Sequence, residues 1–155
     1  MGRVDRRERL ERFRSGYEAV VDALAGATDA DLDRRPPEGW SARMVVHHLA
    51  DSEATAYVRL RRLVAEESPT IGAYDEESFA RRLHYERPIA PSLAVLRAVR
   101  EASLQLLETL DPDEWGRAGT HTESGAYSVE DWLDIYARHP HDHAEQIRRA
   151  RRGEA

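Results

Sequence analysis

The chain has 155 residues and a formal net charge of −6, with 34% charged and 41% hydrophobic residues, which is typical of a soluble globular protein with a single domain over residues 1–155. The negative charge argues against nucleic acid as the main partner, and the absence of cysteine excludes disulfides, thiolate nucleophiles and cysteine-based zinc sites. No stretch approaches about 18 consecutive apolar residues and the charged N-terminus lacks a signal-peptide pattern, so we expect a cytoplasmic protein with no membrane partner.

Apolar residues spaced three and four apart predict a first amphipathic helix over about residues 5–25. Gly26 ends this pattern, and a short helical turn is expected at residues 29–34. Two prolines and a glycine within residues 36–39 then predict a loop.

A second helix is predicted to begin after Ser41, which is a good N-cap residue, and to run to about Glu66. His48 falls on the apolar side of this helix, whereas His47 flanks the core. Residues 71–91 are less regular, with a short helix expected at residues 76–83.

The third helix follows Pro91 and carries its apolar residues inward as far as Leu110. An acidic stretch with a proline then predicts a short helical turn that carries Trp115. Three glycines mark an extended or hairpin segment around His121.

The fourth helix is predicted to begin after Ser128, with Asp131 completing an arrangement like a capping box, and to reach about Arg152. Pro140 removes one backbone hydrogen bond within it and is expected to bend it. The chain therefore reads as an all-α four-helix bundle, with a long irregular connection before the third helix and a short hairpin-like connection before the fourth.

Three histidines stand where core residues are expected. His139 and His143 are spaced i, i+4 on the inward stripe of the fourth helix, and His48 faces inward on the second. Three neutral imidazoles that converge from two helices form an open site for a divalent metal. The alternative is that each histidine is neutral and hydrogen-bonded inside the bundle. His141 points the opposite way and is expected at the surface.

Several polar residues lie near these histidines. Asp51 is one turn after His48 and either orients an imidazole or is a solvent-exposed carboxylate. Glu53 faces away from His48 and is the poorer ligand candidate. Gln146, one turn beyond His143, either supports the site or bonds to the first helix.

Two further residues admit two interpretations each. Arg59 lies close to the histidine face of its helix and either binds an anionic substrate group or pairs with Glu101 or Asp134, and the pairing is preferred. His121 either hangs over the site or is an ordinary loop histidine, and the loop interpretation is preferred.

Motifs from four parts of the chain occur together and in order. They are Leu32-Asp-Arg-Arg-Pro36, Trp40-Ser41 followed by His48-Leu-Ala-Asp51-Ser-Glu53, His121-x-Glu123-x-Gly125 within residues 115–129, and His139-x-x-x-His143-x-x-Gln146-Ile147. This set resembles the DinB/YfiT-like superfamily over nearly the whole chain, and within it the YfiT-like metal-dependent hydrolases. Some of their relatives are thiol transferases that use bacillithiol, mycothiol or glutathione.

The resemblance implies a bundle of up-down-down-up topology, a homodimer, and a divalent metal, often nickel or zinc, on His48, His139 and His143. The chain departs from the pattern in two places. Pro140 lies inside the last motif, and Glu53 stands where some YfiT-like members have another histidine.

Two activities on a small-molecule substrate follow from such a site: hydrolysis by metal-activated water, or S-transfer from a low-molecular-weight thiol bound as thiolate. Asp51, His121 and Glu123 are the candidate catalytic bases or proton shuttles, and Arg59 or Arg100 would supply charge for an anionic thiol. The resemblance favours thiol transfer or another detoxification or stress-response reaction. The alternative is a non-catalytic, metal-binding, stress-related module.

Overall fold

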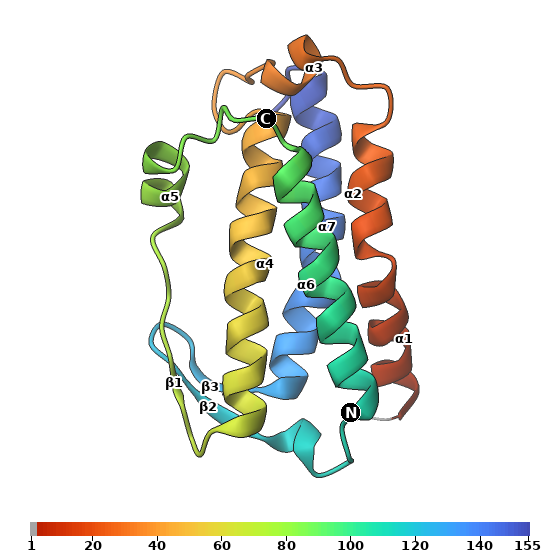
Figure 1. Cartoon of the computed structure of the whole chain (residues 1–155), viewed down its shortest axis with the longest axis vertical. Helices are drawn as coiled ribbons and strands as arrows, with labels where there is room; N and C mark the ends of the chain where they lie inside the picture. Colours follow the sequence, from red (N-terminus) through yellow and green to blue (C-terminus); the bar gives the residue numbers. More distant parts are fainter. Residues whose placement is uncertain (1–2) are drawn as a thin grey trace.

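The computed structural model describes residues 3–155, which are mostly helical (Figure 1). The helices are α1 (Arg3–Arg14), α2 (Gly16–Leu24), α3 (Asp29–Asp33), α4 (Ala42–Ala65), α5 (Glu76–Arg82), α6 (Ala90–Thr109), the short 3-10 helix η1 (Glu114–Gly116) and α7 (Val129–Arg151). The strands are β1 (Thr70–Ile71), β2 (Ala118–His121) and β3 (Gly125–Ser128).

The long helices pack side by side as a four-helix bundle, in which α1 and α2 together form one member (Figure 1). In this view α1, α2 and α7 run upward, while α4 and α6 run downward. Helix α3 covers the upper end, α5 stands beside α4, and the strands lie at the lower end. The N-terminus is at the lower end of the bundle and the C-terminus at the upper end.

The helix boundaries follow local chemistry. Ser41 accepts a hydrogen bond from the backbone N–H of Met44, and Ser128 forms a capping box with Asp131, so both predicted N-caps are confirmed. The prediction of one continuous first helix is wrong, because the helix is interrupted at Ser15. The hydroxyl of this residue bonds back to a carbonyl three residues earlier, which competes with regular helix geometry.

A small sheet corrects the all-α prediction. Strand β2 pairs with β3 in an antiparallel hairpin, which is the predicted hairpin-like connection before α7. Strand β1 adds to its edge in parallel, with Thr70 opposite Thr120. A two-residue strand has no periodicity to read in the sequence, and its partner lies about fifty residues away, so β1 could not be predicted.

The bundle has two apolar clusters with a polar layer between them. The lower cluster packs around Trp132 and Phe13, and the upper cluster around Val45 and Ile147. Residues 50–55 of α4 and 138–143 of α7 lie between the two along their helices, and His48 stands at the edge of the upper cluster beside Leu49. The predicted histidine site therefore interrupts the core at mid-bundle.

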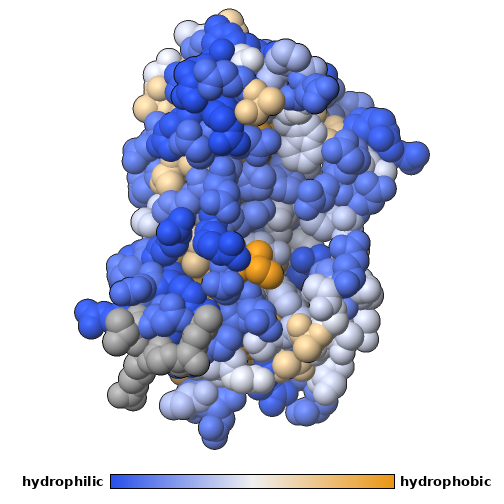
Figure 2. Space-filling view, turned by 180° about the vertical axis from the view of Figure 1, so that it is seen from behind, coloured by the Kyte–Doolittle hydropathy of each residue, from blue (hydrophilic) through white to orange (hydrophobic). Residues whose placement is uncertain are grey.

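The face shown in Figure 2 is mostly hydrophilic, with apolar residues in small separate spots. Among residues 5–155, the exposed large hydrophobic side chains are Val58, Leu83, Val95 and Ile135. Among residues 3–155, no helix is both long enough and apolar enough to cross a membrane.

Candidate metal centre

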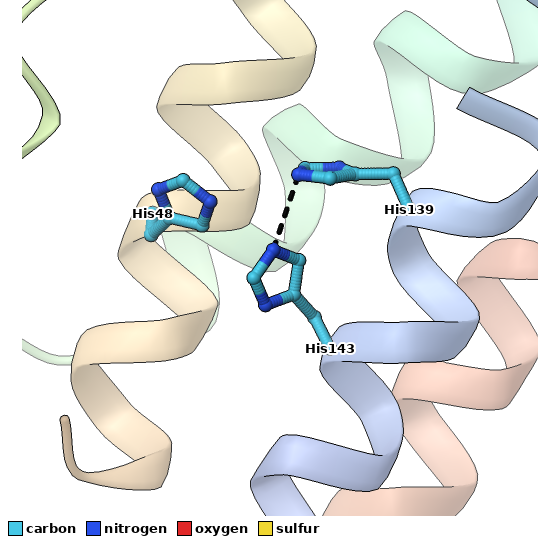
Figure 3. Close-up of side chains that lie close together, drawn as sticks. All are labelled: His48, His139 and His143. Atoms are coloured by element: carbon cyan, nitrogen blue, oxygen red, sulfur yellow. Dashed lines mark hydrogen bonds between the residues drawn. The ribbon is translucent and has the colours of Figure 1, made fainter. Parts of the chain in front are cut away.

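Three imidazoles meet between α4 and α7 (Figure 3). His48 projects from α4, and His139 and His143 project from successive turns of α7. One ring nitrogen from each lies within 4.8 Å of the other two. The Nε2 atoms of His139 and His143 are 3.1 Å apart, and the ring centroids of His48 and His143 are 4.8 Å apart. The structure thus brings together the three histidines that the sequence predicted as metal ligands.

Burial keeps the rings of His48 and His143 neutral. Desolvation, and then the neighbouring histidines, lower the pKa of His48 to about 3. Desolvation, followed by the effect of His139, lowers the pKa of His143 to about 4. A neutral imidazole is the form that binds a metal, so protonation does not compete with metal binding at these two residues near neutral pH.

The outer nitrogens of the two α7 histidines are held by hydrogen-bond acceptors. Nδ1 of His139 donates to Oε1 of Glu53 at 3.2 Å, and Nδ1 of His143 donates to the amide oxygen of Gln146 at 2.6 Å. Without a cation, the 3.1 Å contact between the two Nε2 atoms is a hydrogen bond that needs a proton on one of them (Figure 3). With both protons on Nδ1, each Nε2 instead offers a lone pair to a cation. Two nitrogens bound to one zinc ion at about 2.0–2.1 Å lie about 3 Å apart, so a cation between them fits the observed spacing.

His48 contributes the third imidazole of the cluster, from α4. Its side chain is buried, and within residues 3–155 its Nδ1 has no hydrogen-bond partner. The ring of Trp40 packs beside it at a centroid distance of 5.1 Å, which fixes its orientation. Three imidazole nitrogens in this arrangement suit a zinc, nickel or similar divalent ion and leave further positions open.

Pro140 does not break the helix between the two α7 histidines, because α7 runs without interruption over Val129–Arg151. A proline has no N–H for the carbonyl four residues earlier, which belongs to Tyr136. The guanidinium of Arg100 donates to that carbonyl at 3.1 Å instead. Gly16 leaves the space for this contact, since a Cβ there would lie 2.5 Å from Pro140 and 2.6 Å from Arg100.

Glu53 has a role in the structure that the sequence did not predict. It was expected to face away from His48 and to be the poorer ligand candidate, and it is not part of the three-histidine cluster, but it is 2% exposed and accepts from His139. Its oxygens also accept from Nη1 of Arg100 at 2.9 and 3.0 Å, which forms a buried ion pair. The guanidinium of Arg100 is therefore buried and paired inside the bundle. The prediction that it supplies charge for an anionic thiol is wrong.

The other histidines near the site have structural partners. His47 is fully buried, with one ring nitrogen 2.8 Å from the hydroxyl of Ser92 and the other 2.8 Å from the carbonyl of Arg87. His141 lies on the opposite side of α7, where its ring bonds to the carbonyl of Arg12. Neither belongs to the three-histidine cluster.

A polar cavity of about 220 Å³ opens beside His139. The residues that line it are Ser52, Arg59, Ala73, Tyr74, Glu76, His121, Glu123, Ile135, Tyr136 and His139. His121 therefore faces the cavity next to the histidine site, which favours the interpretation in which it hangs over the site. Its Nδ1 accepts from the backbone N–H of Glu123 at 3.1 Å, so a neutral ring carries its proton on Nε2.

Asp51 does not line this cavity. Its carboxylate accepts a hydrogen bond from the hydroxyl of Tyr85 at 2.7 Å, and it lines a separate hollow between α4 and residues 71–79. Within the described part of the chain it makes no hydrogen bond to His48. A role for Asp51 as a catalytic base stays a prediction.

Arg59 does line the cavity, and its preferred pairing is wrong. Glu101 pairs with Arg97 and Asp134 pairs with Arg138, each on its own helix. Arg59 instead donates to the carbonyl of Gly72 at 2.7 Å and, more weakly, to the hydroxyl of Tyr136 at 3.4 Å.

A sequence profile of the DinB superfamily matches residues 9–147 of this chain. The chain belongs to the DinB superfamily. The resemblance inferred from the histidine motifs is thus confirmed. The motifs with His48, with His121 and with His139 and His143 lie on the elements that build the three-histidine cluster and the cavity beside it.

Relatives within the superfamily carry names that refer to metal-dependent hydrolysis. A "putative metal-dependent hydrolase" of Oceanobacillus iheyensis is 40% identical over 109 residues, which cover 70% of this chain and 63% of that protein. A protein of the same designation from Bacillus mycoides is 30% identical over 146 residues, which cover 90% of this chain and 84% of that one. The alignment to the first relative spans less than two thirds of its length.

A solved structure shows the same fold within the DinB superfamily. It is described as "YfiT from Bacillus subtilis is a probable metal-dependent hydrolase with an unusual four-helix bundle topology". It superposes with a TM-score of 0.90 at 28% sequence identity, over 100% of this chain and 91% of that chain. The four-helix bundle predicted from the sequence is therefore confirmed.

In this DinB-superfamily site, Gln146→Ala is expected to weaken zinc binding about 10- to 100-fold, which is the usual cost of losing a partner that orients a metal-binding imidazole. Titration of the metal-free protein with zinc measures this change. Gln105→Ala, an exposed glutamine on α6, is the matched control and should bind zinc like the parent. Equal affinities in the two variants would show that the bond to His143 does not support metal binding.

Proposed function

We propose that this protein is an enzyme that uses a divalent transition metal, nickel or zinc, on His48, His139 and His143 to hydrolyse a small-molecule substrate. The observation that carries the proposal is the convergence of three imidazoles, two of them oriented by Glu53 and Gln146, beside a polar cavity. A purely structural metal site would have no need of the cavity.

A divalent cation held by three neutral imidazoles keeps its full positive charge and lowers the pKa of a bound water or thiol. The residues of the cavity would transfer protons and contact the substrate. His121 carries a proton on Nε2 and Glu123 is an exposed carboxylate, so these two would exchange protons with substrate or solvent. Arg59 would contact the substrate from the cavity wall.

Transfer from a low-molecular-weight thiol is the second candidate activity. Arg59 favours it, because a cationic side chain in the cavity would attract the carboxylates of such a thiol. Two observations favour hydrolysis of a smaller substrate instead. Arg100 is paired with Glu53 in the core, so it is not available to a thiol, and the cavity volume is only about 220 Å³. A non-catalytic, metal-binding, stress-related module is the remaining alternative.

Turnover assays separate these activities. The zinc- and nickel-loaded protein is incubated with panels of amide and ester substrates, and separately with monobromobimane and several thiols. Hydrolysis predicts turnover without thiol that is lost in His143→Ala and kept in His84→Ala, an exposed histidine that lies outside the cluster. Turnover that requires a thiol would instead establish S-transfer. No turnover in either assay would leave the metal-binding module.

We further propose a cytoplasmic homodimer without a nucleic acid or membrane partner. The net charge of −6 supports the absence of nucleic acid binding. Sedimentation equilibrium of the zinc-loaded protein tests the dimer, since a single species of 17.7 kDa would contradict it.

A further inference from the structure

Unsatisfied polar atoms gather around the cavity beside His139. Nε of Arg59 is buried and has no hydrogen-bond partner among the described residues. The hydroxyl of Tyr74 is buried too and makes no hydrogen bond of normal geometry there, although Ser52 lies close enough to act on its pKa as a hydrogen-bond partner. Buried polar groups are nearly always paired, so two such groups on one cavity wall indicate a missing partner. Both are donors, because a guanidinium has no acceptor and burial raises the pKa of Tyr74 to about 12, which keeps its hydroxyl protonated.

The charge of Arg59 is also uncompensated. No carboxylate in the described chain lies within 4.0 Å of its guanidinium, which donates only to Gly72 and to Tyr136. The two carboxylates that line the cavity, Glu76 and Glu123, are exposed to solvent and do not pair with it. The buried Nε–H and the unpaired charge of Arg59 are therefore available to an acceptor that carries negative charge.

The position of Arg59 relates it to the metal site. It lies on α4 eleven residues after His48, which is about three helical turns, so it projects from nearly the same face. The separation along the axis is roughly 16 Å, and a helical side chain leans back toward the N-terminus, which shortens it. The same cavity is lined by His139 of the histidine cluster and by Ser52, which lies between His48 and Arg59 on α4.

We infer that the substrate of this site is a small acid whose oxyanion group binds Arg59, with the hydroxyls of Tyr74 and Tyr136, while its reactive group lies at the histidines. The oxyanion is a carboxylate or a phosphate, which share the acceptor geometry that a guanidinium recognises. The cavity of about 220 Å³ is smaller than the roughly 300–1,000 Å³ of drug-sized ligand sites, so the acid is small. This inference rests on the proposed function for the placement of the reactive group.

The test measures binding rather than turnover. The zinc-loaded protein is titrated with butyrate, butyl phosphate and butyramide, and the Nε–H resonance of Arg59, assigned by its loss in Arg59→Gln, is followed by NMR. We expect at least one of the two anions to shift this resonance and butyramide to leave it unchanged. Which anion binds distinguishes a carboxylic acid from a phosphate ester.

Variants decide whether Arg59 holds the anion. Affinity for the anion should fall about 10- to 100-fold in Arg59→Gln, as expected for the loss of charge-assisted hydrogen bonds, and recover partly in Arg59→Lys. Arg62→Gln is the matched control, because Arg62 lies on the same helix but pairs with Glu66 outside this cavity. Circular dichroism melting checks that each variant is folded.

Anion binding that does not depend on Arg59 would contradict the inference. Anion binding that is unchanged in Arg59→Gln but lost in His143→Ala would mean that the metal alone holds the anion, and the inference would fall. Anion binding at Arg59 in a protein that turns over no substrate would sustain the anion site at Arg59 and contradict its assignment to the substrate of an enzyme. The two proposals can therefore fail separately.

Discussion

Arg100→Leu is expected to lower the free energy of unfolding by about 3–5 kcal/mol, which is the usual cost of removing one partner of a buried ion pair. The change leaves the carboxylate of Glu53 buried without its cation. It also removes the donor to the Tyr136 carbonyl, which Pro140 has deprived of its helical partner, and the donor to the carbonyl of Phe13. Urea denaturation in the presence of a chelator measures the effect without a contribution from bound metal.

The double variant Glu53→Leu/Arg100→Leu tests whether the loss comes from an unpaired charge. Replacing both partners by apolar residues should recover part of the stability, because no buried carboxylate remains. Arg97→Leu is the control on the same helix. Its pair with Glu101 is exposed, and its loss should change stability little. A double variant as unstable as the single one would assign the effect to the two orphaned carbonyls instead.

Periodicity was sufficient to find the metal-binding candidates. On α7 the spacing of His139 and His143 matches one helical turn, and both replace apolar residues on an inward stripe. A helix places such residues side by side whatever its tertiary partners, so this part of the site follows from local geometry. His48 needed one further assumption, that the apolar sides of α4 and α7 face each other.

The partners of those ligands required tertiary information. Glu53 lies about 140° around α4 from His48, so helical geometry alone points it away from the site. It reaches His139 because Arg100 of α6 lies behind it. One signal was present in the sequence: Arg100 stands four residues after Leu96 and three before Ser103, on the inward stripe of its helix. An arginine at such a position predicts a buried carboxylate partner, though not which one.

Loop residues were the least predictable part. The hairpin that carries His121 and Glu123 was expected from its glycines, but its position over the cavity depends on how β2 pairs with β1. That pairing is set by backbone contacts between distant segments, and side-chain patterns do not report it. The preferred pairing of Arg59 was wrong for a related reason. Its partner is the backbone carbonyl of Gly72, which directly follows β1, and side-chain patterns do not report such a contact.

Zinc is expected to bind the metal-free protein with a stoichiometry close to one and to stabilise it. At a free zinc concentration of about 100 times the dissociation constant, the gain is about 2.7 kcal/mol, because the unfolded chain does not hold three imidazoles together. For a chain of this size the melting temperature should rise by roughly 5–11 °C. Calorimetric melting with and without zinc, with elemental analysis of protein purified without a histidine tag, measures both quantities.

His48→Ala should abolish this stabilisation, because the remaining pair supplies only two ligands, both from α7, and no ligand from α4 ties the two helices together. His47→Ala is the informative control, since it removes an adjacent, fully buried histidine that bonds to Ser92 and Arg87. That variant should melt at a lower temperature than the parent, yet keep the zinc-dependent rise. The same rise in His48→Ala as in the parent would place zinc elsewhere, and the three-histidine cluster would then be a neutral, hydrogen-bonded layer of the core.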